Sequence, residues 1–211
     1  MKKLIWCLAV SFLVVIVMAC QKEETKSDPA AQDFKSATTA SSATPAPVAP
    51  ASSPYDLQFL DTMSKHHASA IEMAKMAQGK IEQPELKALV AKIPVDQQKE
   101  IDQMKSWRDQ WYPAAPSAEN MKMPGMSSSM NMDMGGMQSM KQGHDYDLMF
   151  IDMMVPHHEA AVMMSREALT KAQHPEIKKL AQQIIDAQTK ESGEMKKWKE
   201  GLAKGGQAHK H

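Results

Sequence analysis

The sequence predicts an all-α protein, a four-helix bundle made of two duplicated helical hairpins. The stretch YDLQFLDTMSKHHASAIEMAKMA, which begins at Tyr55, aligns without a gap with YDLMFIDMMVPHHEAAVMMSREA, which begins at Tyr146. In each copy, and in the stretch that follows it, apolar residues recur at helical spacing without strand-like alternation. A hairpin with one apolar stripe cannot bury that stripe alone, so the two hairpins should pack against each other.

Each hairpin should contain two helices with a short turn between them. The first repeat, residues 55–112, and the second, residues 146–204, stay in register through Pro84 and Pro175, and proline suits the first turn of a helix. Pro94 lies inside the second expected helix and should kink or split it. The expected helices span residues 55–77, 84–111, 146–171 and 175–203.

The N-terminus has the pattern of an export signal. Residues 1–20, MKKLIWCLAVSFLVVIVMAC, have two lysines ahead of an apolar run that is too short for a membrane span, and then small residues. The end of this segment is similar to the bacterial lipobox, which predicts a lipid on Cys20 as the only membrane attachment. The same residues also suit ordinary signal peptidase. We therefore expect a periplasmic or cell-envelope protein that is lipid-anchored at Cys20.

Composition limits the partners and the means of stabilisation. Cys7 is removed with the signal, so Cys20 is the single mature cysteine and an intrachain disulfide is excluded. An exported chain without disulfides must be stabilised by its core or by metal. Without Lys2 and Lys3, 23 basic residues remain against 25 acidic ones, which gives no electrostatic attraction to nucleic acid or to a membrane surface.

Three further segments lie outside the hairpins. Residues 21–54 are rich in Ala, Ser, Thr and Pro, which predicts a disordered tether. Residues 205–211 form a tail whose final HKH could bind metal adventitiously. The linker, residues 113–145, is long enough to cross the length of a bundle. A ferritin-like crossover and a simple up-and-down order are both allowed.

A paired-histidine motif, D-x-M-x-x-H-H-x-x-A-x-x-M, occurs in both repeats. At 100° per residue its methionines and histidines share a helical stripe about 120° wide, the width of a face that packs on a core. In the following helix Gln97 and Glu100 interrupt an apolar stripe, and imidazoles opposite them would satisfy these groups with or without a metal. The alternative is that the histidines are hydrogen-bonded core residues and the methionines fill an irregular core.

The linker carries a second pattern, because the stretch MKMPGMSSSMNMDMGGMQSMKQGH has eight methionines among Gly, Ser, Asn and Asp. In an extended chain an M-x-M pair places both sulfurs on one side. Thioethers are soft donors that suit Cu(I) and Ag(I). The alternatives are a flexible hydrophobic contact loop and an oxidant sink. The linker methionines are Met121, Met123, Met126, Met130, Met132, Met134, Met137 and Met140.

The duplicated motif with a downstream Q-x-x-E-x-x-x-M resembles the domain-of-unknown-function family 305, which includes the CopM-like exported copper-binding proteins, here as two tandem copies. The resemblance implies a ferritin-like four-helix bundle that binds copper, and also silver, through Met and His. The implied metal ligands are Met63, His66, His67, Met73 and Met104 in the first unit, and Met154, His157, His158, Met164 and Met195 in the second. The first unit has Ser64-Lys65 where the second has Val155-Pro156, which implies an altered or weaker first site.

We therefore expect a tethered copper-binding protein, not an enzyme, that sequesters Cu(I) for resistance or transfers it to another envelope copper-handling protein. Cu(II) is expected at the imidazole-rich positions. One alternative is a ferritin-like metalloenzyme or oxidase, but the E-x-x-H motifs of di-iron bundles are missing from both units. The other alternative is a metal-free structural or interaction module.

Overall fold

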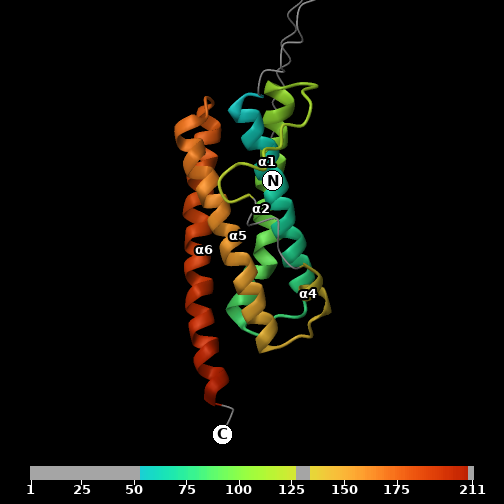
Figure 1. Ribbon diagram of the computed structural model, residues 1–211, viewed down its shortest axis with the longest axis vertical. Coiled ribbons are helices and arrows are strands. Elements are labelled where there is room, and N and C mark those ends of the chain that lie inside the picture. Colours follow the sequence, from blue (N-terminus) through green and yellow to red (C-terminus); the bar gives the residue numbers. More distant parts are fainter. Residues whose placement is uncertain (1–52, 127–133, 209–211) are drawn as a thin grey trace, which may run out of the picture. The chain divides into compact units, whose positions relative to one another are not determined.

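The computed structural model describes residues 53–126 and 134–208, and these ranges confirm the all-α expectation. Four long helices pack as a bundle, with one short helix beside them (Figure 1). The expected signal peptide with Cys20, nearly all of the tether, Met130, Met132 and the last three residues lie outside the described ranges. None of the described helices is long and apolar enough to cross a membrane. The helices are α1 (Tyr55–Ala77), α2 (Pro84–Trp111), α4 (Met134–Ser139), α5 (His144–Lys171) and α6 (Pro175–Ala208).

The observed helix boundaries agree closely with the sequence pattern in the first hairpin, where α1 and α2 have the expected bounds. In the second hairpin, α5 begins two residues earlier than expected, directly after Gly143, and α6 continues to Ala208. Of the kink or split expected at Pro94, the split does not occur, because α2 is one helix from Pro84 to Trp111. Proline removes one N–H donor from the helix, but packing against the core keeps α2 continuous through Pro94.

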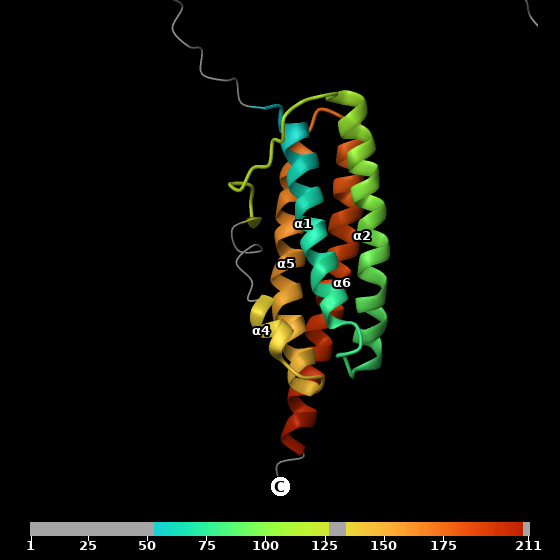
Figure 2. The ribbon, with the colours of Figure 1, turned by 90° about the vertical axis from the view of Figure 1, so that its right-hand side faces the viewer.

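The connection between the hairpins is a crossover that spans the length of the bundle (Figure 2). Asp147, near the start of α5, accepts hydrogen bonds from the backbone N–H groups of Glu82 and Gln83 in the α1–α2 turn. At the opposite end, the ring of Trp111, at the end of α2, stacks on that of His174 in the α5–α6 turn, with 3.8 Å between centroids. The chain therefore leaves α2 at one end and enters α5 at the other, which selects the ferritin-like order.

An approximate two-fold relation links the hairpins, and two buried carboxylates show it. The Asp56 carboxylate accepts hydrogen bonds from the N–H groups of Gln173 and His174, each at 2.9 Å. Asp147, at the equivalent position in the second repeat, does the same for the α1–α2 turn, at 3.1 and 2.8 Å. Hydrogen bonds to a charged group contribute about 1.5–3 kcal/mol each, so these contacts fix α1 and α5 as antiparallel neighbours.

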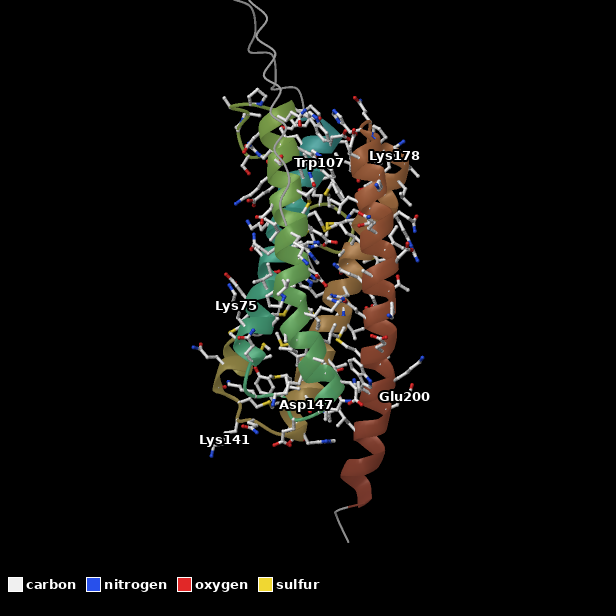
Figure 3. All side chains as sticks on the ribbon, turned by 180° about the vertical axis from the view of Figure 1, so that it is seen from behind. Lys75, Trp107, Lys141, Asp147, Lys178 and Glu200 are labelled. Atoms are coloured by element: carbon white, nitrogen blue, oxygen red, sulfur yellow. The ribbon has the colours of Figure 1, made fainter. Side chains whose placement is uncertain are left out.

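The bundle core has two apolar clusters, one toward each end. Figure 3 labels Trp107 near one end of the bundle and Asp147 near the other. We call them the Trp107-end cluster and the Tyr146-end cluster, after a residue that lies in or against each. The Trp107-end cluster contains Phe59, Leu60, Ile177, Ile184 and their buried neighbours. The Tyr146-end cluster contains Leu86, Ile93, Phe150 and theirs. Both clusters include buried methionines, and the duplicated histidines lie between them along the helices.

The linker packs on the bundle, which the sequence did not predict. The backbone N–H groups of Ala118 and Asn120 donate to the side chains of Asp61 and Thr62 on α1, at 2.8 and 2.9 Å. Gly125, at φ +83°, lies so close to α5 that a Cβ added there would be 2.6 Å from the Cα of Ala160. Only glycine suits both that backbone conformation and that approach, so the linker is fitted to this surface.

Two linker methionines correct the expectation of an extended M-x-M pair. Met121 is 46% exposed whereas Met123 is 4% exposed and packs in the Trp107-end cluster, so their side chains do not share a side. The reason is that the chain turns here, with backbone hydrogen bonds from Met123 to Asn120 and from Met126 to Met123.

Candidate metal centre

Four histidines form a fully buried layer in the middle of the bundle. His66 and His67 come from α1, His157 and His158 come from α5, and each is 0% exposed. The rings of His66 and His157 are in contact across the two helices, with 3.7 Å between their centroids. Because α1 and α5 are antiparallel and carry the motif at equivalent positions, the two pairs meet at the same level.

The second helix of each hairpin supplies a carboxylate to this layer. The Nε2 atom of His67 lies 2.7 Å from Glu100, and that of His158 lies 2.9 Å from Glu191. The sequence predicted this pairing of imidazoles with the polar positions on the apolar stripe of α2 and α6. The expected glutamine contacts are not formed, because the buried Oε1 atom of Gln97 has no hydrogen-bond partner in the described part of the chain.

One hydroxyl that the sequence reasoning missed also reaches the layer. The Oγ atom of Ser69 lies 2.7 Å from the Nε2 atom of His157 and 2.7 Å from the carbonyl oxygen of His66. The signal was a difference between the repeats, since the position equivalent to Ser69 is Ala160. Ser69 is not part of the motif that the two repeats share, so the motif did not identify it.

Several ring nitrogens in the layer have no hydrogen-bond partner. Both nitrogens of His66 are buried and unpaired within the described residues. The same is true of the Nδ1 atoms of His67, His157 and His158. Buried polar atoms are rarely left without a partner, and leaving one costs about 1–3 kcal/mol. A set of neighbouring lone pairs inside a core is what a metal-binding site requires.

The histidines that touch each other are held neutral. Burial lowers the pKa of His66 well below its usual value, and the positive charges that His157, His67 and His158 would carry lower it further. Burial likewise lowers the pKa of His157, with His158 and His67 adding to the effect. Imidazole binds metal in its neutral form, so these two rings are ready to do so below the usual histidine pKa.

Glu191 is held ionised despite its burial. Desolvation raises its pKa, but the hydrogen bond from His158 and the contact with Lys92, 3.0 Å away, together outweigh this effect and lower the pKa overall. An ionised carboxylate is the better acceptor for an imidazole N–H. It therefore orients the ring of His158 and increases its basicity toward a metal.

The candidate bundle methionines lie above and below the histidine layer, and they are grouped across the repeats. All six are at most 1% exposed. The sequence suggested one ligand group for each repeat, but the two groups in the structure each contain methionines from both repeats. Because α1 and α5 are antiparallel, Met164 joins the methionines of the first repeat and Met73 joins those of the second. Met63, Met104 and Met164 belong to the Trp107-end cluster, and Met73, Met154 and Met195 belong to the Tyr146-end cluster.

The linker methionines are divided between the two clusters and the surface. Met123 and Met126 are buried in the Trp107-end cluster, and Met137, on α4, is buried in the Tyr146-end cluster. Met134 packs against the latter while partly buried. Met121 and Met140 are 46% and 37% exposed. The buried linker methionines therefore add thioethers to both ends of the bundle core.

The donor set limits which metals fit. Within residues 53–126 and 134–208, no three side chains of His, Cys, Asp or Glu gather in a way that could hold a metal ion. Thioether sulfurs of the buried methionines lie on either side of the imidazole layer and are further donors that a metal held there could take. Such donors suit soft, monovalent Cu(I) and Ag(I), and they suit hard cations poorly.

Family and structural comparisons agree with this geometry. The family model described as "Domain of unknown function (DUF305)" matches residues 56–199. The chain belongs to this family. The match is one span over both hairpins, so it does not confirm two tandem copies. No curated protein matches the chain.

Among solved structures, "CopM in the Cu(I)-bound form" is 37% identical, with a TM-score of 0.59 over 69% of this chain and 96% of that one. "CopM in the Ag-bound form (by co-crystallization)" is also 37% identical over the same shares, with a TM-score of 0.58. A DUF305 protein from Streptomyces coelicolor is 24% identical, with a TM-score of 0.64 over 72% and 96%. The last of these supports the fold alone.

Proposed function

We propose that this protein binds Cu(I) and Ag(I) outside the cytoplasm through buried methionines and histidines, and that Cu(II) binds at the histidine layer. The observation that carries the proposal is the fully buried layer in which His66 has neither ring nitrogen paired. Support also comes from CopM, which has been solved with Cu(I), Cu(II) and Ag bound.

Hydrogen bonding alone is a poor explanation for the layer. If these histidines were ordinary core residues, their ring nitrogens should be paired, as almost all buried polar groups are. Instead, five ring nitrogens are buried without a partner in the described residues. An apolar side chain at His66 would fill the same space without that cost. The unpaired nitrogens are therefore best explained as metal ligands.

The two methionine groups suggest two soft-metal sites related by the approximate two-fold axis. Each would combine imidazole from the layer with thioethers from one cluster, and each would draw on both hairpins. A cation held in this way is shielded from water and from oxygen, which suits sequestration. We assign the protein a non-catalytic role, with the lipid on Cys20 as its anchor.

Anaerobic titration of the full chain with Cu(I) and Ag(I), in competition with a colorimetric chelator, tests the proposal. His66→Leu and His157→Leu keep the core filled, so the fold should remain while each variant loses at least tenfold in affinity at one or both sites. His144→Ala, at the first residue of α5 and away from the layer, is the control and should bind as wild type does. Unchanged Cu(I) affinity in both layer variants would refute the proposal, as would equally tight binding of Zn²⁺.

A further inference from the structure

The hydroxyl of Ser69 has a specific role in the histidine layer. We propose that Ser69 is a positioning residue: it holds the proton of His157 on Nε2, so that Nδ1 presents its lone pair to the metal and the two halves of the layer become unequal. The metal-binding consequence rests on the proposed function, whereas the position of the proton can be tested in the metal-free protein.

The proton assignment follows from two contacts at one oxygen. Ser69 Oγ lies 2.7 Å from the carbonyl oxygen of His66, which can only accept a hydrogen bond. The single hydroxyl hydrogen must therefore be donated to that carbonyl, as serine in a helix commonly does. The Nε2 atom of His157 is also 2.7 Å from Oγ. Since Oγ has no second hydrogen to give, His157 must donate its own N–H, and the proton is on Nε2.

Two other histidines also carry a proton on Nε2, and there the hydrogen-bond partner is a carboxylate instead of a hydroxyl. His67 and His158 each have Nε2 within hydrogen-bond distance of a glutamate, at 2.7 and 2.9 Å. A neutral imidazole beside a carboxylate donates its N–H to it. In all three rings Nε2 carries the proton, and Nδ1 is the buried nitrogen without a partner in the described residues. In the neutral form of each ring, the lone pair is therefore on Nδ1.

His66 differs from His157 because the second repeat has no hydroxyl group that could form the equivalent hydrogen bond to it. The equivalent of Ser69 in α5 is Ala160, which is fully buried and lies under Gly125 of the linker. Both ring nitrogens of His66 are consequently unpaired. Its tautomer is free to adapt, so His66 can offer either nitrogen while His157, in contact with it, offers only Nδ1.

Because the tautomer of His157 is fixed and that of His66 is not, the two histidines should differ in their affinity for metal. A ligand whose tautomer is already correct pays no cost to rearrange, which favours binding at that ring. Ser69 therefore makes His157 the pre-set ligand of the contacting pair and leaves His66 as the adaptable one. Because a neutral hydrogen bond contributes about 0.5–1.5 kcal/mol, loss of the hydroxyl should weaken Ag(I) binding about 2- to 10-fold.

Long-range ¹H–¹⁵N NMR of the imidazole nitrogens in the metal-free chain tests the assignment directly. In wild type, His157 should show a protonated Nε2 and an unprotonated Nδ1. Ser69→Ala should give His157 a mixture of tautomers, and Ser69→Thr, which keeps the hydroxyl, should restore the wild-type pattern. Ser165→Ala removes another buried hydroxyl, one without a partner in the described residues, and should leave His157 unchanged.

The outcomes separate the two proposals. An unprotonated Nε2 at His157 in wild type, or an unchanged His157 in Ser69→Ala, would overturn the role of Ser69 whatever the metal data show. The wild-type spectrum decides the question even if the alanine variant fails to fold. If the tautomer changes as expected but Ag(I) binding to wild type is absent, the proposed function fails while the proton assignment stands. A changed tautomer with unchanged Ag(I) affinity would refute the metal-positioning role.

Discussion

A change from pH 7.5 to pH 5.0 should strongly destabilise the metal-free protein. His66 and His157 are buried in the folded state, where their pKa values lie well below the usual one. In the unfolded chain each should titrate near pH 6.5. The unfolded state therefore binds more protons than the folded state below that pH, and the free energy of unfolding must decrease as the pH falls.

The magnitude follows from the linkage relation. A histidine that stays neutral when folded and titrates near 6.5 when unfolded costs about 2 kcal/mol at pH 5.0. The pair should therefore remove up to about 4 kcal/mol, a large share of the stability of a small domain. The lowered pKa of Glu191 acts outside this window. Its contribution is present above the usual glutamate value of 4.5 and is lost only as the pH falls through the lower folded-state pKa.

Urea unfolding followed by circular dichroism, at pH 7.5 and 5.0 with a chelator present, measures the effect. His66→Leu removes one of the two groups and should reduce the loss to about 2 kcal/mol, half the wild-type value. His144→Ala provides the control, because it changes a half-buried histidine at the first residue of α5, away from the layer, and it should lose as much stability as wild type does. If wild type loses less than about 1 kcal/mol over this range, the two rings are not held neutral and the reasoning is refuted.

Three further predictions concern the linker, the carboxylates and the anchor. Met126→Ala empties a fully buried site and should cost about 2–5 kcal/mol in urea unfolding, whereas Met121→Ala, at a 46% exposed position, should cost under about 0.5 kcal/mol; equal costs would contradict the packing of the linker. Glu191→Gln should weaken Cu(II) binding more than Cu(I) binding in parallel titrations, because thioethers need no orienting carboxylate, and equal losses would count against that role. Cys20→Ala should move the protein from the membrane fraction to the soluble fraction or block its maturation, and a wild type that is already soluble would exclude the anchor.

The helices and the pairing of histidine with glutamate could be predicted from the amino-acid sequence. Apolar spacing is a local property, so α1 and α2 have the predicted bounds and α5 and α6 differ from theirs only at their ends. The contacts of Glu100 with His67 and of Glu191 with His158 join the two helices of one hairpin. Their registers are coupled through a short turn, so facing positions can be read from the helical stripes.

The way in which the two hairpins pack against each other could not be predicted from the sequence. The buried carboxylates of Asp56 and Asp147 bind the opposite hairpin's turn, and this makes α1 and α5 antiparallel. That arrangement brings His66 against His157 and places Met164 in the same cluster as Met63, whereas Met154 belongs to the other cluster. Spacing within one repeat has no information about a neighbour that is reached through a long crossover. The grouping of ligands therefore had to come from the structure.

The contacts of the linker and of Ser69 also could not be predicted from the sequence. The composition of the linker predicts little burial, yet Met123 and Met126 fill the Trp107-end cluster because the linker crosses α1 and α5 where their side chains leave room. In the sequence Ser69 is one of several polar residues on its helix. Its role depends on the ring of His157, which is 88 residues away in the chain. Sequence patterns capture what is periodic or repeated, whereas a contact made once, between segments far apart in the chain, exists only after the chain has folded.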